Sequence, residues 1–160
     1  MTVFTIGHST RSSEDFIAAL KAAGVTMLAD IRRFPKSRRY PHFNGENLAP
    51  ALAAAGIGYR HFPELGGRRG KRADGEPSLN TLWRQEPFRN YADYAETPEF
   101  RAAFDKLAAL TRESTVAIMC AEAVWWQCHR RIVADYLLAA GFPVEHIYDA
   151  KKREPATLTP

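Results

Sequence analysis

Short apolar runs alternate with stretches of helical period along almost the whole chain. The apolar runs predict strands at 2–6, 25–31, 57–62, 115–119 and 144–148. Between them, apolar residues recur at the spacing of one helix face, which predicts helices at 12–23, 46–55, 88–95, 97–111 and 128–140. This alternation indicates right-handed crossovers and a mostly parallel, twisted sheet. We therefore predict an α/β fold with about five strands and helices on both faces, a three-layer, Rossmann-like arrangement.

Local signals mark the ends of several predicted helices. Gly24, Gly56 and Gly141 each follow a helical pattern, where glycine adopts the left-handed backbone at low cost. The Thr97-Pro98 pair favours the start of a helix. Pro50 is tolerated only in a first turn, so we expect the second helix to start later than its apolar pattern indicates.

Composition indicates one ordinary globular domain. The chain has 160 residues, of which 46% are hydrophobic and 25% charged. We expect a single domain at 1–150 and a flexible tail at 151–160. No apolar run approaches the length of about 20 residues that spans a bilayer, and we see no signal peptide. We therefore expect a cytoplasmic protein without a membrane partner, in which the two cysteines are thiols.

In a parallel sheet, the residues that follow each strand meet at one edge, where α/β proteins bind ligands. The residues in these positions are His8, Ser9, Arg32, Arg33, Glu64, Cys120 and Glu122. Because distant parts of the chain converge there, we predict a binding crevice at this edge. The strand order that would decide which of them touch does not follow from the sequence.

Glu122 is our leading candidate for an acid, a base or a nucleophile. Beside two tryptophans its carboxyl can be partly desolvated, which raises a carboxyl pKa; the alternative is a solvated loop acid or a partner for Arg130. His8 can assist as acid or base, or can simply bond its own loop backbone. Trp125 and Trp126 can stack on a base or form a hydrophobic lid.

Cys128 opens the last predicted helix, with His129 and Arg130 directly after it. Backbone N–H groups at a helix start favour an anion and lower a thiol pKa, and Arg130 can bond a phosphate or carboxylate. Cys120 ends a buried strand, and both cysteines can equally be inert packed thiols. Their spacing matches no common zinc pattern, so we predict no metal and see no required cofactor.

Two loops, 32–44 and 63–80, concentrate basic residues among aromatic and glycine residues. The net charge of +4 also favours anionic partners. Basic side chains next to aromatic ones suit a nucleotide or nucleic acid, although a solvated basic face is the alternative. We count Arg33, Ser37, Arg68 and Arg69 among the candidate contacts to an anionic substrate.

Several short motifs point to one family. They are Thr5-Ile6-Gly7-His8-Ser9, Asp30-Ile31-Arg32, Phe43-Asn44, Gly56-Ile57-Gly58-Tyr59, Leu65-Gly66-Gly67, Cys120-Ala121-Glu122 and Cys128-His129-Arg130. Together they cover nearly the whole chain and resemble the bacterial and archaeal family named domain of unknown function 488. The resemblance implies the α/β fold and a site at these motifs, and it leaves the reaction open. Many members of that family carry a proline where Trp125 stands here. A weaker likeness to rhodanese-like and phosphatase-like folds is an analogy only.

We predict an enzyme that acts on a nucleotide or nucleic acid by hydrolysis or group transfer. In this interpretation Glu122 reacts, His8 assists, and Arg32 and Arg130 hold an anion. One alternative is thiol chemistry of the rhodanese kind, either sulfur transfer or redox, at Cys120 or Cys128. Another alternative is a non-catalytic nucleic-acid-binding module. The sequence leaves the substrate and the oligomeric state open.

Overall fold

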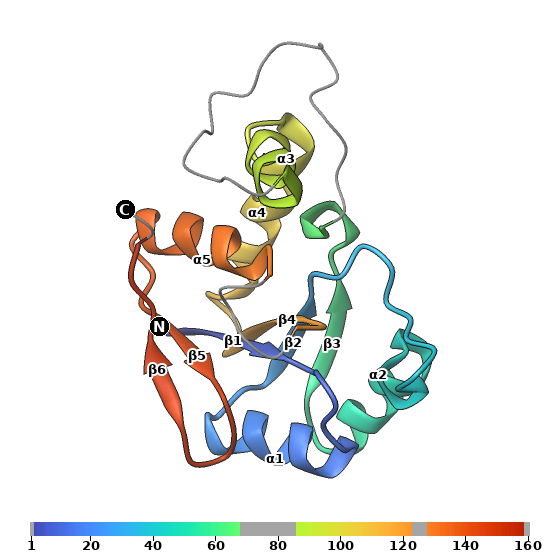
Figure 1. The fold of residues 1–160 in the computed structure, drawn as a ribbon. Coiled ribbons are helices and arrows are strands. Elements are labelled where there is room, and N and C mark those ends of the chain that lie inside the picture. The colour runs from blue at the N-terminus through green and yellow to red at the C-terminus, as the bar shows by residue number, and fades with distance from the viewer. Residues whose placement is uncertain (1, 68–85, 123–127, 159–160) are drawn as a thin grey trace.

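The structure is a computed structural model and describes residues 2–67, 86–122 and 128–158. Its elements are drawn in Figure 1. The strands are β1 (Val3–Gly7), β2 (Met27–Asp30), β3 (Gly58–His61), β4 (Val116–Cys120), β5 (Val144–Ile147) and β6 (Arg153–Pro155). The α-helices are α1 (Ser13–Ala22), α2 (Gly45–Ala54), α3 (Glu86–Tyr94), α4 (Pro98–Leu110) and α5 (Arg130–Ala139), and the short 3-10 helices are η1 (Pro41–Phe43) and η2 (Pro63–Leu65).

The described strands form one sheet in the order β3-β2-β4-β1-β5-β6. All neighbouring strands are parallel except β5 and β6. The predicted α/β class and mostly parallel sheet are therefore confirmed. The expected number of about five strands was wrong, because Arg153–Pro155 pairs with β5 as a sixth strand without any apolar pattern. This strand lies in the segment 151–160 for which we expected a tail. The three-layer, Rossmann-like description stays a prediction.

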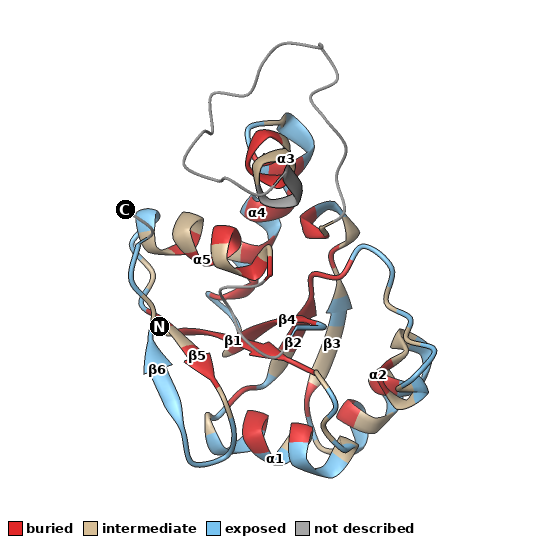
Figure 2. Cartoon of the chain, viewed as in Figure 1, coloured by how far each residue is buried: buried red, intermediate tan, exposed pale blue. Residues whose placement is uncertain are grey.

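The central strands of the sheet consist of buried residues (Figure 2), and their side chains pack into an apolar cluster on each face. Ala117 and Met119 of β4 belong to one apolar cluster with residues of α1 and α2. Val116 and Ile118 point the other way and belong to a second cluster, with residues of α4 and α5. Burial on both faces explains why the central strands read as continuous apolar runs. No helix in the described residues is both long and apolar enough to cross a membrane.

The predicted helix signals act largely as expected. The Ser12 hydroxyl accepts a hydrogen bond from the backbone N–H of Asp15 at 3.1 Å, which caps α1. Pro50 was the exception, because α2 begins at Gly45 and so contains this proline in its interior. The first turn of α2 lies before Pro50 in the sequence and does not need its missing N–H. Leu48 and Leu52 are buried and hold the helix against the core.

The connections between strands place the carboxyl ends of β2 and β4 at a topological switch point. These two strands are neighbours, yet the chain leaves β2 toward β3 and leaves β4 in the other direction, past β1 to β5. Open α/β sheets bind ligands outside the carboxyl ends of the strands at such a point. We call the residues that follow β1, β2 and β4 the carboxyl edge.

Candidate functional site

Backbone hydrogen bonds join the loops of the carboxyl edge. The N–H of His8 donates to the carbonyl of Cys120 at 2.9 Å, and the N–H of Ser9 donates to the carbonyl of Ala121 at 3.0 Å. Ser9 has a φ of +47°, in the left-handed region that non-glycine residues rarely adopt. These contacts hold the turn after β1 against the start of the loop after β4.

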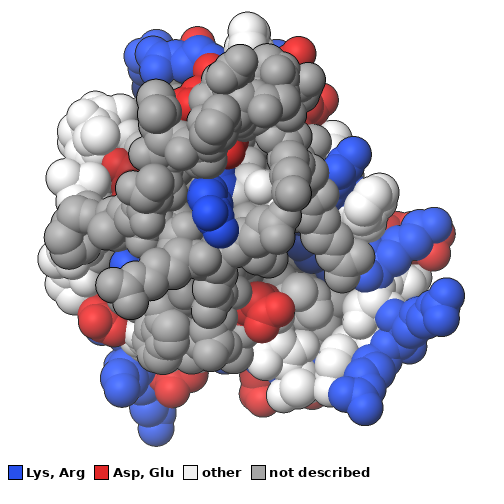
Figure 3. All heavy atoms as spheres, turned by 45° about the horizontal axis from the view of Figure 1, so that its top comes forward, with Lys and Arg blue, Asp and Glu red and all other residues white. Residues whose placement is uncertain are grey.

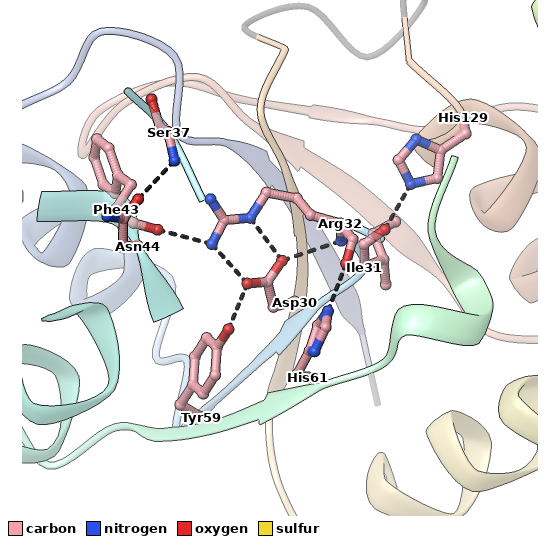
Figure 4. A network of polar contacts seen from close by, with 9 residues as sticks. All are labelled: Asp30, Ile31, Arg32, Ser37, Phe43, Asn44, Tyr59, His61 and His129. Atoms are coloured by element: carbon pink, nitrogen blue, oxygen red, sulfur yellow. Dashed lines mark hydrogen bonds and ion pairs between the residues drawn. The ribbon is translucent and has the colours of Figure 1, made fainter. Parts of the chain in front are cut away.

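Asp30, at the end of β2, is the centre of a buried polar network (Figure 4). Its Oδ1 accepts from the backbone N–H of Arg32 at 3.1 Å and from Nε of Arg32 at 2.9 Å. Its Oδ2 accepts from Nη2 of Arg32 at 2.7 Å and from the Tyr59 hydroxyl at 2.5 Å. Burial raises the pKa of Tyr59, and the Asp30 carboxylate raises it further, so the hydroxyl stays a donor. The network therefore fixes the edge of the Arg32 guanidinium that carries Nε and Nη2.

One nitrogen of the buried Arg32 guanidinium has no protein partner among the described residues. Nη2 also donates to the carbonyl of Phe43 at 2.8 Å, whereas Nη1 has no hydrogen-bond partner in the described part of the chain. The Arg32 side chain is only 6% exposed, and a buried donor without a partner is costly. Because Nε and Nη2 face Asp30, an anion would meet the end of the guanidinium at Nη1.

His8 is a neutral imidazole beside this arginine. Its Nδ1 lies 3.0 Å from the carbonyl of Ser9, which can only accept a hydrogen bond, so Nδ1 carries the hydrogen and Nε2 of the neutral ring does not. Burial lowers the pKa of His8 to about 4, and the positive charge of Arg32 lowers it as well. The His8 ring stacks on Phe43 at 4.5 Å between centroids. At neutral pH the unprotonated Nε2 can accept a proton.

Cys120 and Cys128 are buried free thiols. Sγ of Cys120 donates to the backbone carbonyl of Glu122 at 3.8 Å, and the backbone N–H of Arg130 donates to Sγ of Cys128 at 3.4 Å. Burial raises the pKa of Cys120, but its polar neighbours, the Cys128 thiol and the Arg130 guanidinium among them, outweigh burial and lower this pKa overall. Burial raises the pKa of Cys128, and the neighbouring Cys120 thiol adds to that effect.

Arg130, at the start of α5, is 1% exposed. Its Nη2 donates to the backbone carbonyl of Glu122 at 3.4 Å, and its Nε has no partner among the described residues. In that same part of the chain no carboxylate forms an ion pair with it. A buried cation of this kind requires an anion nearby.

Two histidines donate to the end of β2. Nε2 of His129 lies 2.8 Å from the carbonyl of Ile31, and Nε2 of His61 lies 2.6 Å from the carbonyl of Arg32 (Figure 4). A carbonyl accepts, so Nε2 of His129 carries a hydrogen. Nδ1 of the same ring lies 3.3 Å from Sγ of Cys128.

A family model described as "Domain of unknown function DUF488" matches residues 12–137. The chain belongs to the DUF488 family. The predicted resemblance is thus confirmed, and the description of the family names no activity. Neither the comparison with curated proteins nor the comparison with solved structures found a match.

The DUF488 chain brings most of the predicted site residues to the carboxyl edge. They are His8, Ser9, Arg32, Cys120, Glu122, Cys128, His129 and Arg130. Glu122 is exposed, which differs from the partial desolvation that we expected. Its backbone carbonyl, rather than its carboxylate, accepts the bond from Arg130. Trp125, Trp126, Arg68 and Arg69 lie outside the described residues.

Two further candidates lie on the loop after β2 of this DUF488 protein. Ser37 organises that loop: its N–H donates to Oδ1 of Asn44 at 2.6 Å, and its hydroxyl accepts from the N–H of Tyr40 at 3.0 Å. Arg33 is exposed, with its guanidinium 5.4 Å from the ring centre of Phe34. The loop also exposes Lys36, Arg38 and Arg39. Figure 3 shows several Lys and Arg side chains projecting close together from one side of the molecule.

The sequence analysis missed Asp30 and Tyr59 as site residues. A signal existed, because β2 is a buried apolar strand that ends in an acid, with an arginine two positions later. A buried carboxylate at such a position needs a cationic partner. Among the described residues, no group of three or more His, Cys, Asp or Glu side chains is placed to hold a metal ion.

Proposed function

We propose that this DUF488 protein is an enzyme that acts on a phosphate-bearing substrate, a nucleotide or nucleic acid, at the carboxyl edge. The observation that carries the proposal is buried Arg32, whose Nη1 has no partner among the described residues, beside the neutral His8. Both residues contact Phe43: Nη2 of Arg32 donates to the Phe43 backbone carbonyl, and the His8 ring stacks on the Phe43 ring. A fixed cation next to a proton acceptor suits hydrolysis or group transfer at a phosphate ester or an N-glycosidic bond.

Each residue has a distinct role in this proposal. Arg32 donates from Nη1 to a phosphate oxygen, in a position that Asp30 fixes. His8 accepts a proton at Nε2 from the attacking group. Glu122 stands at the exposed side of the same edge as acid, base or nucleophile, one residue after the carbonyl that bonds Ser9.

Binding of inorganic phosphate and of adenosine monophosphate, followed by calorimetry at low salt, tests the proposal. Arg32→Lys keeps the charge but cannot both pair with Asp30 and present a second nitrogen, so we expect affinity to fall at least about tenfold. Arg101→Lys is the matched control, since Arg101 lies on α4, is 71% exposed and pairs with Asp105. Equal affinity in both variants, or no binding by the unmodified protein, would refute the proposal.

Thiol chemistry at Cys120 and Cys128 is a second candidate function. The specific observation in its favour is the setting of Cys128, whose Sγ accepts from the backbone N–H of Arg130 at 3.4 Å and lies 3.3 Å from Nδ1 of His129. A thiolate held by a guanidinium is the reactive form of cysteine. Labelling of the native protein with iodoacetamide at neutral pH tests this function, and two unreactive thiols would remove it.

A further inference from the structure

We infer that the loop after β2, residues 32–44, binds a single strand of nucleic acid, with phosphates on Lys36, Arg38 and Arg39 and one base stacked on Phe34. The inference deepens the proposed function and rests on it, because it names the form of nucleic acid that would bring a phosphate to Arg32. A free nucleotide would use the Arg32 site alone, whereas a strand would continue along the loop. The two ligands therefore differ in the residues that they need.

The charge of this loop is the first argument. Between residues 31 and 45 the sequence has no aspartate or glutamate, and its basic residues there are Arg32, Arg33, Lys36, Arg38 and Arg39. The side chains of Lys36, Arg38 and Arg39 are exposed, and within the described part of the chain none of them forms an ion pair. Cations of this kind neutralise the phosphates of a nucleic-acid backbone.

Phe34 supplies the second argument. Its side chain is 58% exposed, and Leu158 is the other large apolar side chain that is exposed among the described residues. The Arg33 guanidinium lies 5.4 Å from the ring centre of Phe34, and the exposed part of the ring has room for a second planar group. Unpaired bases stack on exposed aromatic rings beside cations, whereas the bases of a duplex are stacked on one another. A lipid surface needs a larger apolar face than a single ring provides.

The backbone of the loop is held in place by hydrogen bonds to its own residues and to α2. The N–H of Lys36 donates to the carbonyl of Phe34 at 2.8 Å, which closes a three-residue turn at Pro35. The carbonyl of Pro35 accepts from the N–H of Gly45, the first residue of α2, at 2.9 Å. A loop that is already ordered loses little conformational entropy when a strand binds.

The same loop leads to the Arg32 guanidinium. Figure 4 shows this guanidinium pointing toward Ser37, Phe43 and Asn44. Nη2 of Arg32 donates to the Phe43 carbonyl at 2.8 Å, and the N–H of Ser37 donates to Oδ1 of Asn44 at 2.6 Å. A phosphate bonded to Nη1 of Arg32 would therefore lie beside the segment that carries the exposed cations. We expect the next phosphates of the same strand to meet those cations.

Fluorescence anisotropy of a labelled oligothymidylate of about 12 nucleotides, titrated with the full chain, tests the inference. We expect binding that weakens as salt is added. The loop variant combines Lys36→Gln, Arg38→Gln and Arg39→Gln. It should reduce the slope of log affinity against log salt by about 2, because each phosphate contact with a single strand contributes about 0.7. Binding to vesicles of phosphatidylserine without binding to the oligonucleotide would overturn the inference in favour of a lipid surface.

The matched control for charge combines Lys21→Gln, Lys106→Gln and Arg112→Gln. These side chains are exposed and their loss changes the net charge equally. Lys21 is near the end of α1 and Arg112 follows α4, so both precede the amino ends of strands rather than the carboxyl edge. We expect this control to keep the salt slope of the unmodified protein. An equal loss of slope in both triple variants would show that only net charge matters, and the inference would be wrong.

Stacking is tested with Phe34→Ala, and Leu158→Ala is the control because its side chain is similarly exposed, at 56%. Phe34→Ala should weaken binding of the single strand at least about fivefold, since a stacked base is lost. Leu158→Ala should not weaken it. If the two variants bind the oligothymidylate equally, no base stacks on Phe34 and the inference is wrong.

Adenosine monophosphate separates a failure of this inference from a failure of the proposed function. The loop variant should bind it within about threefold of the unmodified protein at about 0.15 M salt, because Arg32 is unchanged and more distant charges are screened. An unmodified protein that binds the nucleotide but not the oligothymidylate would refute the inference and leave the proposed function standing. A protein that binds neither would refute both.

Discussion

Asp30 shows how one buried side chain can set the chemistry of another. Its carboxylate accepts from the backbone and side chain of Arg32 and from the Tyr59 hydroxyl, and its side chain is fully buried. Such a pair is tolerated because nearly every donor and acceptor is satisfied. The exception is Nη1 of Arg32, which is the atom that the proposed substrate would bond.

Replacement of Asp30 by asparagine removes the charge that balances buried Arg32. We expect Asp30→Asn to lower the free energy of unfolding by about 3–5 kcal/mol, measured by urea denaturation. The control is Asp105→Asn in the pair with Arg101, whose side chains are 62% and 71% exposed. That exposed pair should contribute no more than about 1 kcal/mol. A loss below about 1 kcal/mol for Asp30→Asn would show that Arg32 is not dependent on this carboxylate.

Two buried histidines predict how stability depends on pH. Burial lowers the pKa of His8 and of His146 to about 4 in the folded protein, from 6.5. Below 6.5 the unfolded chain binds protons that the folded chain does not, so stability is complete above pH 6.5 and falls as the pH approaches 4.

Urea denaturation between about pH 7 and pH 5, above the range of most carboxyls, isolates this effect. We expect the free energy of unfolding to fall with pH, by at most about 1.4 kcal/mol per pH unit for each histidine. His146→Asn should reduce the slope, since only His8 then contributes. Stability that is flat or rises toward pH 5 would contradict the burial of these imidazoles.

At the scale of elements, α2 contains a proline in its interior, at position 50. Pro50 lacks the N–H that would bond the carbonyl of Glu46, and it lies on the exposed side of the helix. Pro50→Ala should raise the free energy of unfolding by about 2 kcal/mol after the added freedom of the unfolded chain is counted. The measurement is again urea denaturation.

Pro98 is the matched control for this change. It is the first residue of α4, where the missing N–H would have no helical partner. Pro98→Ala should therefore leave stability unchanged or lower it by up to about 1 kcal/mol. If Pro50→Ala destabilised the protein instead, residue 50 would have to make a native contact that alanine cannot replace.

The elements of this chain follow from local pattern, whereas their pairing does not. Apolar runs such as Val116–Cys120 identified the central strands because these are buried on both faces. The insertion of β4 between β2 and β1 depends on crossovers that no local residue encodes. The Asp30–Tyr59 bond follows from that pairing, since β2 and β3 are neighbours. A parallel sheet alone predicts that these residues converge at the carboxyl edge. Which of them contact one another depends on the strand order, and that did not follow from the sequence.

At the scale of the whole molecule, the sheet has buried central strands and one solvent-exposed edge strand, β6. β1 and β4 are buried throughout, whereas every residue of β6 is exposed. Pro155 ends β6 and cannot donate to a further strand, which limits edge-to-edge pairing with other chains. The candidate site lies at the buried centre, far from β6 in the strand order.

Removal of residues 151–160 tests whether the fold depends on β6. The deletion removes the ladder with β5, the bond from the Ala156 N–H to the Val144 carbonyl at 2.8 Å, and the ion pair of Arg153 with Glu145 at 3.8 Å. Because these groups are largely exposed, we expect cooperative unfolding to persist, with a loss below about 2 kcal/mol. Arg153→Ala alone, as the control, should cost less than about 0.5 kcal/mol. Loss of the cooperative transition in calorimetry would mean that β6 belongs to the folding unit, because β5 would then be unable to hold its place beside β1 without it.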